Sequence, residues 1–197
     1  KKTPTIEEYQ DIFGMIQNQT ERLSHLSEVL LDMTGIQSVE RSDFISLAEL
    51  TDEVCCDLAS IADQKKVELI QEEGDCTVTG SYLLLYRAVY NLVENAIKYN
   101  HSGGKVTVKI SQKKDLPAAH SKPTDYALVE VTDTGIGISP EFQEKIFDPF
   151  FRVDKSRSRA MGGAGLGLAL VNEIARQHGG QVKVLASSEK GSTIALI

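Results

Sequence analysis

The chain has 197 residues, of which 41% are hydrophobic and 25% are charged, and its formal net charge is −7 at pH 7. This length allows one domain of ordinary size with an appendage, and the hydrophobic fraction is enough to build a core. The acidic balance argues against a nucleic-acid partner, because phosphate backbones are bound mainly by clustered Lys and Arg.

Cysteine usage and hydropathy favour a soluble chain in a reducing compartment. Cys55, Cys56 and Cys76 form neither a C-x-x-C ligand pair nor an even set at disulfide-like spacing, so we expect free thiols with a structural role. No apolar run approaches the roughly 20 residues that cross a bilayer, and no signal peptide is recognisable. We therefore expect a cytoplasmic chain that makes no membrane contact.

The first predicted element is one long amphipathic helix, from about residue 6 to 34. Its apolar residues recur in alternating steps of four and three, which is typical of a helical bundle. Thr5 and Glu8 have the spacing of a capping box, and Gly35 stands where the helix would end. Because such a helix cannot bury its apolar stripe alone, we expect a partner helix. An ordinary core helix is the alternative.

The middle of the chain predicts two helices and three short strands. Ser46 and Glu49 form a second capping box, which marks the start of the first of these helices. The second helix carries apolar residues at helical spacing throughout. In chain order, the expected elements are a strand over 39–45, a helix from 46 to about 66, strands over 67–71 and 77–79, and a helix over 81–99.

The last third of the chain predicts paired strands around one more helix. A polar, proline-containing loop at 113–124 separates the first two strands, and Ser139-Pro140 has the form of a helix start. The expected elements are strands over 105–112 and 126–132, a short helix from 139, a helix over 166–177, and strands over 182–185 and 193–197. Together they predict an α/β sandwich with one layer of helices over a mixed, mostly antiparallel sheet.

Three segments suggest a nucleotide pocket. Residues 133–138 have the sequence DTGIGI, residues 162–168 have GGAGLGL, and residues 91–99 have NLVENAIKY. Glycine lets a backbone come close to phosphate oxygens, because it has no Cβ and visits positive φ freely. A glycine run that leads into a helix also directs unpaired N–H groups at an anion.

In this order, the three segments resemble the ATP-binding catalytic domain of sensor histidine kinases. That domain belongs to a wider ATPase superfamily that includes gyrase, a class of heat-shock chaperones and mismatch-repair proteins. A fourth segment, FDPFFRVDKSRSR at 147–159, is similar to the phenylalanine-containing motif that the kinase branch carries between its two glycine stretches. The resemblance covers roughly residue 38 to the C-terminus.

The resemblance implies an α+β fold, a two-layer α/β sandwich of the Bergerat type preceded by one long bundle helix. Residues 38–197 would be the ATP-binding catalytic domain, and residues 1–37 would be the second helix of the dimerisation hairpin. ATP and Mg²⁺ are the implied cofactors. The implied partners are a phosphoacceptor hairpin, a response regulator receiver domain in a two-component phosphorelay, and a second copy through the N-terminal helix. The parent protein could be anchored in the bacterial inner membrane.

The resemblance also assigns roles to single residues. Asp133 would accept a hydrogen bond from the adenine amine and reject guanine, which presents a carbonyl at that place. Asn95 matches the magnesium ligand of the family, a neutral oxygen suited to a hard cation that bridges phosphates. Lys98 would reach phosphate oxygens, and Tyr99 would lie against the purine ring.

The remaining site residues follow from the glycine stretches and the segment between them. The full set expected around the nucleotide is Asn91, Asn95, Lys98, Tyr99, Asp133, Gly135, Gly137, Ile138, Phe150, Gly163, Gly165, Leu166, Gly167 and Leu168. The basic segment 152–159 would be a mobile lid, in which the catalytic Arg152 and Lys155 neutralise the transferred phosphoryl group. Ala164 stands where many relatives carry threonine, so a hydroxyl contact to phosphate is not expected there.

Position 91 distinguishes the branches of the superfamily. Gyrase-type and repair-type ATPases carry a glutamate one turn before the magnesium asparagine, where it activates water, whereas this chain carries Asn91. Glu94 is a poor substitute, because adjacent residues of a helix point about 100° apart. We therefore expect a pocket that holds ATP for another nucleophile. A stand-alone ATPase and a catalytically silent nucleotide-sensing scaffold are the alternatives.

The phosphoacceptor histidine of the family is not found in this chain. The four histidines, His25, His101, His120 and His178, lack the expected acidic neighbour on a first hairpin helix, so we expect structural or exposed roles. Residues 1–4 are similar to the end of the family's H-[DE]-x-K-T-P motif, but only Thr5 separates them from the helix. A loop between hairpin helices is the favoured interpretation, and the chain should bind ATP without phosphorylating itself.

Overall fold

The computed structural model describes residues 9, 12–14, 16, 20, 39–115, 124–153 and 165–197. Its elements, in chain order, are β1 (Asp43–Ser46), α2 (Leu47–Lys65), β2 (Glu68–Gln71), β3 (Thr77–Gly80), α3 (Tyr82–Lys98), β4 (Lys105–Asp115), β5 (Thr124–Asp133), the 3₁₀ turns η2 (Pro140–Phe142) and η3 (Lys145–Phe147), α5 (Gly167–Gln177), β6 (Val182–Ser188) and β7 (Gly191–Leu196).

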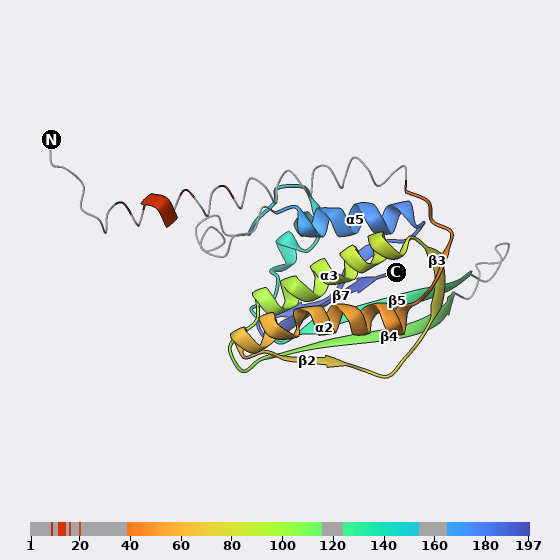
Figure 1. Ribbon diagram of the computed structural model, residues 1–197, viewed down its shortest axis with the longest axis horizontal. Helices are drawn as coiled ribbons and strands as arrows, with labels where there is room; N and C mark the ends of the chain where they lie inside the picture. Colours follow the sequence, from red (N-terminus) through yellow and green to blue (C-terminus); the bar gives the residue numbers. More distant parts are fainter. Residues whose placement is uncertain are drawn as a thin grey trace.

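The elements form two layers, as predicted. Helices α2, α3 and α5 lie side by side over one face of a five-stranded sheet with the order β2-β4-β5-β7-β6 (Figure 1). Only β2 and β4 are parallel; the other neighbouring strands of this sheet are antiparallel. Strands β1 and β3 form a separate antiparallel pair. The expected α+β sandwich with a mixed, mostly antiparallel sheet is confirmed.

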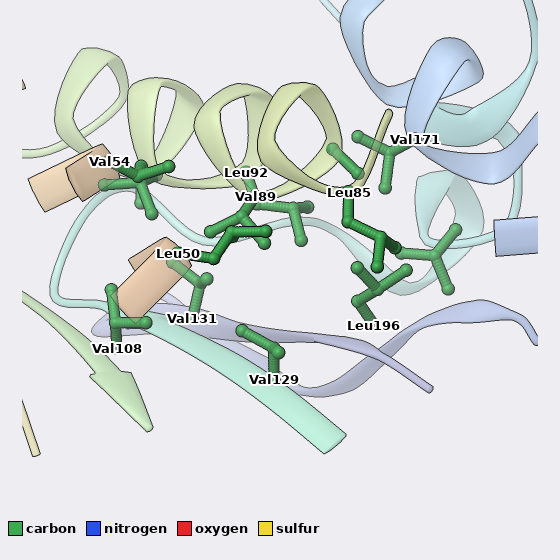
Figure 2. Close-up of a cluster of buried hydrophobic side chains, with 14 of the residues drawn as sticks. Leu50, Val54, Leu85, Val89, Leu92, Val108, Val129, Val131, Val171 and Leu196 are labelled. Atoms are coloured by element: carbon green, nitrogen blue, oxygen red, sulfur yellow. The ribbon is translucent and has the colours of Figure 1, made fainter. Parts of the chain in front are cut away.

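The core fills the space between the helices and one face of the sheet (Figure 2). Leu50 of α2 and Val89 of α3 are fully buried there, and they face Val108 and Val131 of the central strands. Successive strand residues point to opposite faces, so Val106, Val108 and Ile110 are all buried while Lys109 is exposed. This apolar layer holds the ends of α3, β5 and α5 in fixed relative positions.

Helix boundaries agree with the sequence signals. Ser46 caps α2, since its hydroxyl accepts a hydrogen bond from Glu49 N–H at 3.2 Å. Lys66 ends α2 in the left-handed conformation, with φ of 56°. The helices expected over 46–66, 81–99 and 166–177 are observed within about one residue of those limits.

Four smaller predictions were wrong in extent. The strand expected from residue 39 begins only at Asp43, where pairing with β3 begins at Gly80. The hairpin strands run on to the pair Asp115–Thr124, so the predicted loop is shorter than 113–124. Residues 140–142 form a single 3₁₀ turn rather than a helix, and β6 continues to Ser188 because it pairs with β7 up to the hairpin turn.

The first predicted helix falls largely outside the described residues. Tyr9, Ile12, Phe13, Gly14, Ile16 and Thr20 are helical, and the apolar side chains among them are exposed. The rest of the helix expected over 6–34, and with it the division at residue 37, lies outside what the structure describes. Within the described ranges, no helix has both the length and the hydropathy needed to span a bilayer.

The cysteines are free, as expected. Cys55 is half-buried on α2, and burial, with Asp52 and Cys56 nearby, raises the pKa of its thiol to about 11. A thiol with a raised pKa is a weak nucleophile, which agrees with a structural role.

Candidate functional site

The asparagine motif and the second glycine stretch meet at one point. Asn91 and Asn95 lie on the C-terminal half of α3, and Gly167 begins α5. A Cβ placed on Gly167 would lie 2.5 Å from Asn91 Oδ1 and 3.8 Å from Asn95 Nδ2. Asn91 Nδ2 donates to Arg87 O at 2.8 Å, so the amide oxygen of Asn91 points toward the start of α5. Glycine is therefore required at position 167 for this close approach.

The first glycine stretch packs against the end of α3. Asp133 is the last residue of β5, and its Oδ1 accepts a hydrogen bond from Gly135 N–H at 2.7 Å. Ile136 N–H donates to Tyr99 O at 3.3 Å, and a Cβ on Gly135 would overlap that same carbonyl oxygen. The asparagine motif, the first glycine stretch and the described part of the second, 165–168, are thus brought to one edge of the sandwich.

Asp133 is a half-buried carboxylate at this edge. Burial raises its pKa, while hydrogen bonds from the backbone N–H groups of Gly135 and Ser192, and the nearby charge of His101, act in the opposite direction. A partly desolvated carboxylate is a strong acceptor for a further N–H donor. The amine of a bound base would supply such a donor.

The turn after Asp133 is fixed by its contacts with the β6–β7 hairpin. Gly137 has φ of 70°, and a Cβ at this position would overlap Ser188 O. Ile138 N–H donates to Ser187 Oγ at 2.7 Å. The backbone of the turn is therefore held on both sides, by α3 and by the C-terminal hairpin.

Arg152 and Lys98 form a positive cluster between α3 and α5. Burial lowers the pKa of Lys98; Glu94 opposes this effect, and the charge of Arg152 lowers the pKa further. Lys98 Nζ lies 5.9 Å from the centroid of the Tyr99 ring. Arg152 Nη2 is buried and has no hydrogen-bond partner among the described residues. A buried guanidinium nitrogen without an acceptor fits an anionic group of a ligand.

Phe150 and Gly165 flank the stretch 154–164, which lies outside the described residues. Phe150 N–H donates to Gly165 O at 2.8 Å, so the two flanks of this stretch are joined. Both residues have positive φ, 66° for Phe150 and 73° for Gly165. The exposed Phe150 is the only non-glycine residue besides Lys66 with positive φ in the part of the chain that the structure describes. Such strain is often stored at ligand sites.

The other predicted site residues divide into three groups. Leu166 is buried in the core and can offer a ligand only its backbone, whereas Leu168 and Ile138 are partly buried. Lys155 and Gly163 lie outside the described residues. Among the histidines, His101 is exposed, as expected, and His25 and His120 are not described.

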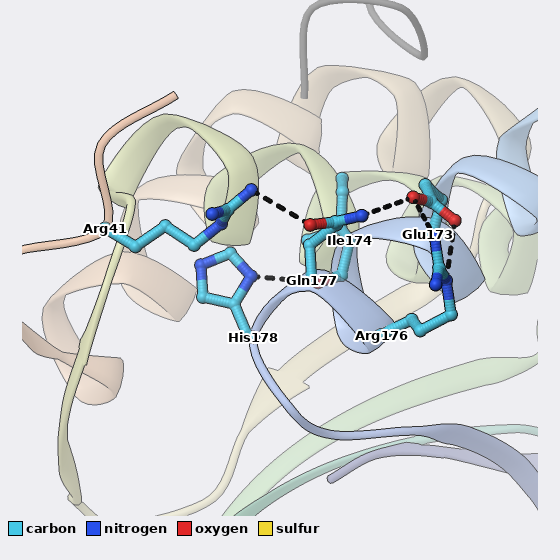
Figure 3. A network of polar contacts seen from close by, with 6 residues as sticks. All are labelled: Arg41, Glu173, Ile174, Arg176, Gln177 and His178. Atoms are coloured by element: carbon cyan, nitrogen blue, oxygen red, sulfur yellow. Dashed lines mark hydrogen bonds and ion pairs between the residues drawn. The ribbon is translucent and has the colours of Figure 1, made fainter. Parts of the chain in front are cut away.

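His178 has a structural role at the other end of α5. Its Nε2 accepts from Ser81 N–H at 3.1 Å. Nδ1 therefore carries the proton and donates to Ile174 O at 2.8 Å (Figure 3). Next to it, Gln177 accepts from Arg41 Nη2 at 3.2 Å and donates to Glu173 at 2.8 Å. One end of α5 thus contributes to the candidate site while the other holds α3 and the segment before β1.

Sequence reasoning missed the polar residues that support the site. Asn100 and Thr134 hydrogen-bond to each other and to Lys105, next to Tyr99 and Asp133. Asn100 directly follows the asparagine motif and Thr134 lies within the first glycine stretch, and these positions were the only available signal. Ser187 and Ser192 had no signal of this kind.

Comparisons with known proteins agree with this geometry. Residues 80–197 match the family described as histidine kinase-, DNA gyrase B-, and HSP90-like ATPase. The sensor-like histidine kinase SenX3 of Mycolicibacterium smegmatis is 33% identical over 182 residues, which are 90% of this chain and 45% of that protein. Sensor histidine kinase WalK of Bacillus subtilis is 32% identical over 183 residues, covering 90% of this chain and 28% of its own length. The chain therefore spans less than half of these relatives.

Solved structures of histidine kinases are also similar to this chain. The mycobacterial sensor histidine kinase MprB is 27% identical with a TM-score of 0.61, covering 78% of this chain and 94% of that one. The catalytic domain of histidine kinase ThkA is 25% identical with a TM-score of 0.60, covering 78% and 93%. The chain belongs to the histidine kinase-, DNA gyrase B- and HSP90-like ATPase family, as the ATP-binding catalytic domain of a sensor histidine kinase.

Proposed function

We propose that this domain binds Mg²⁺–ATP between the end of α3, the end of β5 and the start of α5, and donates the γ-phosphoryl group to a histidine outside the chain. The observation that carries the proposal is the meeting of Asp133, the asparagine motif and an Arg152 nitrogen that has no partner in the described part of the chain, all at one edge of the sandwich. These groups match the base, the metal and the phosphates of one nucleotide.

The base would lie on the side of Asp133. The carboxylate already accepts backbone hydrogen bonds and has lone pairs left for the adenine amine. Tyr99 would contact the ring, and Gly135, Gly137 and Ile138 would line the pocket with backbone. Guanine would place a carbonyl oxygen against a carboxylate, which is repulsive.

The triphosphate would lie on the side of α5. Backbone N–H groups at Gly163, Gly165, Gly167 and the adjoining Leu166 and Leu168 would contact phosphate oxygens at the positive end of the helix dipole. Mg²⁺ would be held by Asn95 and by phosphate oxygens, with water completing the shell, so a cluster of protein carboxylates is not needed. Lys98, Arg152 and Lys155 would neutralise the phosphate charge, and Phe150 would lie at the edge of the lid.

Transfer is favoured over hydrolysis by the residue at position 91. The Asn91 amide cannot take a proton from water, and its Nδ2 is already bonded to Arg87 O. The pocket would therefore position and neutralise the phosphoryl group and leave the nucleophile to come from elsewhere.

The partners follow from the relatives. ThkA is known in complex with a response regulator, TrrA. For the parent of this chain we propose a phosphoacceptor hairpin from its own or a partner chain, a response regulator, and dimerisation through the N-terminal helix. Exposed apolar residues Ile12, Phe13 and Ile16 support that last contact. Attachment of the parent to a membrane is also part of the proposal.

The test mixes the chain with a separate hairpin from its parent that carries the acceptor histidine, and supplies γ-labelled ATP with Mg²⁺. We expect the label on the hairpin histidine and none on this chain, with ATP turnover by the chain alone below about one per second, a low rate for enzymes. Steady hydrolysis above that rate would favour the stand-alone ATPase. Tight ATP binding without any labelled histidine would favour the silent scaffold.

A further inference from the structure

Asn100 and Thr134 form a hydrogen-bonded cluster between the two motifs of the site. Thr134 Oγ1 accepts from Lys105 N–H at 2.9 Å and donates to Asn100 Oδ1 at 3.2 Å, with Lys105 O at 3.4 Å as the alternative acceptor. Asn100 Nδ2 donates to Lys105 O at 2.9 Å, and its Oδ1 also accepts from His101 N–H at 2.9 Å. Both side chains thus use their donors and acceptors inside the protein.

The cluster is closely packed around Gly104. A Cβ at Gly104 would overlap Asn100 Oδ1 and lie 2.8 Å from Thr134 Oγ1. Gly104 N–H donates to His101 O at 3.0 Å, which closes the turn between α3 and β4. Asn100 is therefore confined by Gly104, whereas Thr134 is exposed and is held by its hydrogen bonds to Lys105 and Asn100.

The cluster joins the two halves of the site. Asn100 follows Tyr99 directly, at the end of the helix that carries Asn95 and Lys98. Thr134 stands between Asp133 and Gly135. Besides these side-chain bonds, the backbone contributes two more, from Thr134 N–H to Lys105 O at 3.1 Å and from Ile136 N–H to Tyr99 O at 3.3 Å. The core and the β4–β5 pairing set the general spacing of the metal side and the base side, and Asn100 and Thr134 provide the side-chain link between them.

We propose that Asn100 and Thr134 are positioning residues that fix the Asp133 carboxylate relative to Asn95 and Lys98, and thereby set the preference for adenine over guanine. The inference rests on the proposed function, since it assigns a specificity role within that nucleotide site. When the phosphates are held from the α3 and α5 side, the place of the carboxylate decides whether the base amine reaches it. Discrimination between bases depends on this placement. A misplaced carboxylate can no longer accept a hydrogen bond from the adenine amine, and it no longer repels the guanine carbonyl.

The test compares Thr134→Val, which keeps the shape and removes the hydroxyl, with Thr134→Ser, which keeps the hydroxyl. Dissociation constants for non-hydrolysable ATP and GTP analogues are measured with Mg²⁺ by calorimetry, well below the melting temperature of each variant. For Thr134→Val we expect ATP-analogue affinity to fall about tenfold and GTP-analogue affinity to change less, so that the selectivity ratio falls several-fold. Thr134→Ser should stay within about twofold of the wild type for both analogues.

Asn100→Ala provides the second variant, because it leaves the bond from Lys105 N–H to Thr134 in place and instead removes the bonds of Asn100 to Lys105 O and from His101 N–H. It should lower the same ratio, and its effect should not add to that of Thr134→Val, since both break one cluster. An equal loss of affinity for both analogues, or an unchanged ratio in folded variants, would overturn the inference. If the inference fails in this way but the wild type binds ATP and Asp133→Asn does not, the proposed function still holds. A wild type that binds neither analogue would overturn both.

Discussion

The two sides of the candidate nucleotide site differ in how their polar groups are satisfied. On the base side, the turn after β5 is held by bonds within the protein: Gly135 N–H to Asp133, Ile136 N–H to Tyr99 and Ile138 N–H to Ser187. On the phosphate side, Arg152 Nη2 is buried and unpartnered within the described residues, and the pKa of Lys98 is lowered by burial. Among the described residues, the backbone of the base side is thus held without a ligand, whereas the phosphate side keeps a buried nitrogen without an acceptor.

This difference has a physical consequence for binding. A pre-formed base side needs no rearrangement when adenine enters, so its geometry can discriminate between bases. On the phosphate side, a buried guanidinium nitrogen without an acceptor in the described residues is stabilised when an anion binds, so this side contributes affinity that depends on the number of phosphates. Substitutions on the base side should therefore affect both folding and selectivity, whereas substitutions on the phosphate side should affect mainly the affinity for polyphosphate.

The largest expected effect comes from Asp133→Asn. The carboxylate accepts from Gly135 N–H and from Ser192 N–H, and it would also accept from the adenine amine. The Asn amide has the same shape but replaces one acceptor oxygen with an NH₂ group. At least one of the three N–H donors would then face this NH₂ group instead of an acceptor. We expect ATP affinity to fall at least about 100-fold, the result of losing a charge-assisted bond and creating a mismatch.

Isothermal titration with an ATP analogue measures that loss, and circular dichroism with thermal melting checks that the variant is folded. Asp125→Asn, on the same strand but at its far end, is a matched control and should leave affinity unchanged. Nucleotide affinity that is unaltered in folded Asp133→Asn would contradict the assigned base side.

The next largest effect is expected on stability, from Gly137→Ala. Its φ of 70° and the overlap of a Cβ with Ser188 O both oppose a side chain. Gly103 offers a matched control, because it has a similar φ of 82° but a Cβ at this position would meet no atom within 4 Å. We expect Gly103→Ala to cost about 1 kcal/mol from backbone conformation alone, and Gly137→Ala to cost about 2 kcal/mol or more.

Urea unfolding of both variants gives this comparison directly. Equal losses in the free energy of unfolding would mean that the contact with the β6–β7 hairpin does not hold the turn. A larger loss at Gly137, together with weaker ATP binding, would show that the base side depends on the C-terminal hairpin.

The sequence was sufficient for the features that depend on local pattern. The limits of α2, α3 and α5 follow from apolar periodicity, and for α2 also from the Ser46 cap. Each of these signals comes from residues that are close together in the sequence. The extent of β6 was underpredicted, because Ala186 to Ser188 are small or polar and join the sheet mainly through backbone pairing with β7. That pairing depends on a partner strand and not on side-chain pattern.

The candidate site was predictable where residue type carries the chemistry. Asp133, Asn91 and Asn95 stand in motifs whose side chains have few other uses. Asn100 and Thr134 could not be assigned, because they are 34 residues apart and bond to each other around Lys105 only in the folded chain. The bond from Arg41 to Gln177 spans 136 residues and was equally inaccessible.

A smaller effect on binding is expected from Arg152→Gln. The substitution removes one positive charge from the phosphate side and leaves the hydrogen bonds of the base side intact. We expect ATP affinity to fall about tenfold and ADP affinity to fall less, because fewer phosphate charges are lost from the interaction. The free energy of unfolding without nucleotide should not decrease, since the buried Nη2 has no partner to lose within the described residues.

Lys183→Gln is the control for this charge change, because Lys183 is exposed on β6 and is not a predicted site residue. It should leave both affinities unchanged. An Arg152→Gln variant that is clearly less stable but binds ATP normally would reverse the comparison, and would make Arg152 a structural residue.

The smallest expected effect is a pH dependence of stability that comes from Asp133. Burial raises the pKa of this carboxyl in the folded chain, so between its unfolded and folded pKa values the native state binds more protons than the unfolded state. The free energy of unfolding therefore falls as pH rises through this window, and the penalty is complete above the folded pKa. Asp133→Asn has no group that titrates at this position. We therefore expect the free energy of unfolding of the variant to increase relative to that of the wild type between about pH 3.5 and pH 7, because the wild-type carboxyl titrates above the usual Asp pKa of about 3.9. Urea unfolding without nucleotide measures this difference. A difference that stays constant over this range would mean that the base side does not desolvate its carboxylate, and the contrast between the two sides would then lie in hydrogen bonding alone.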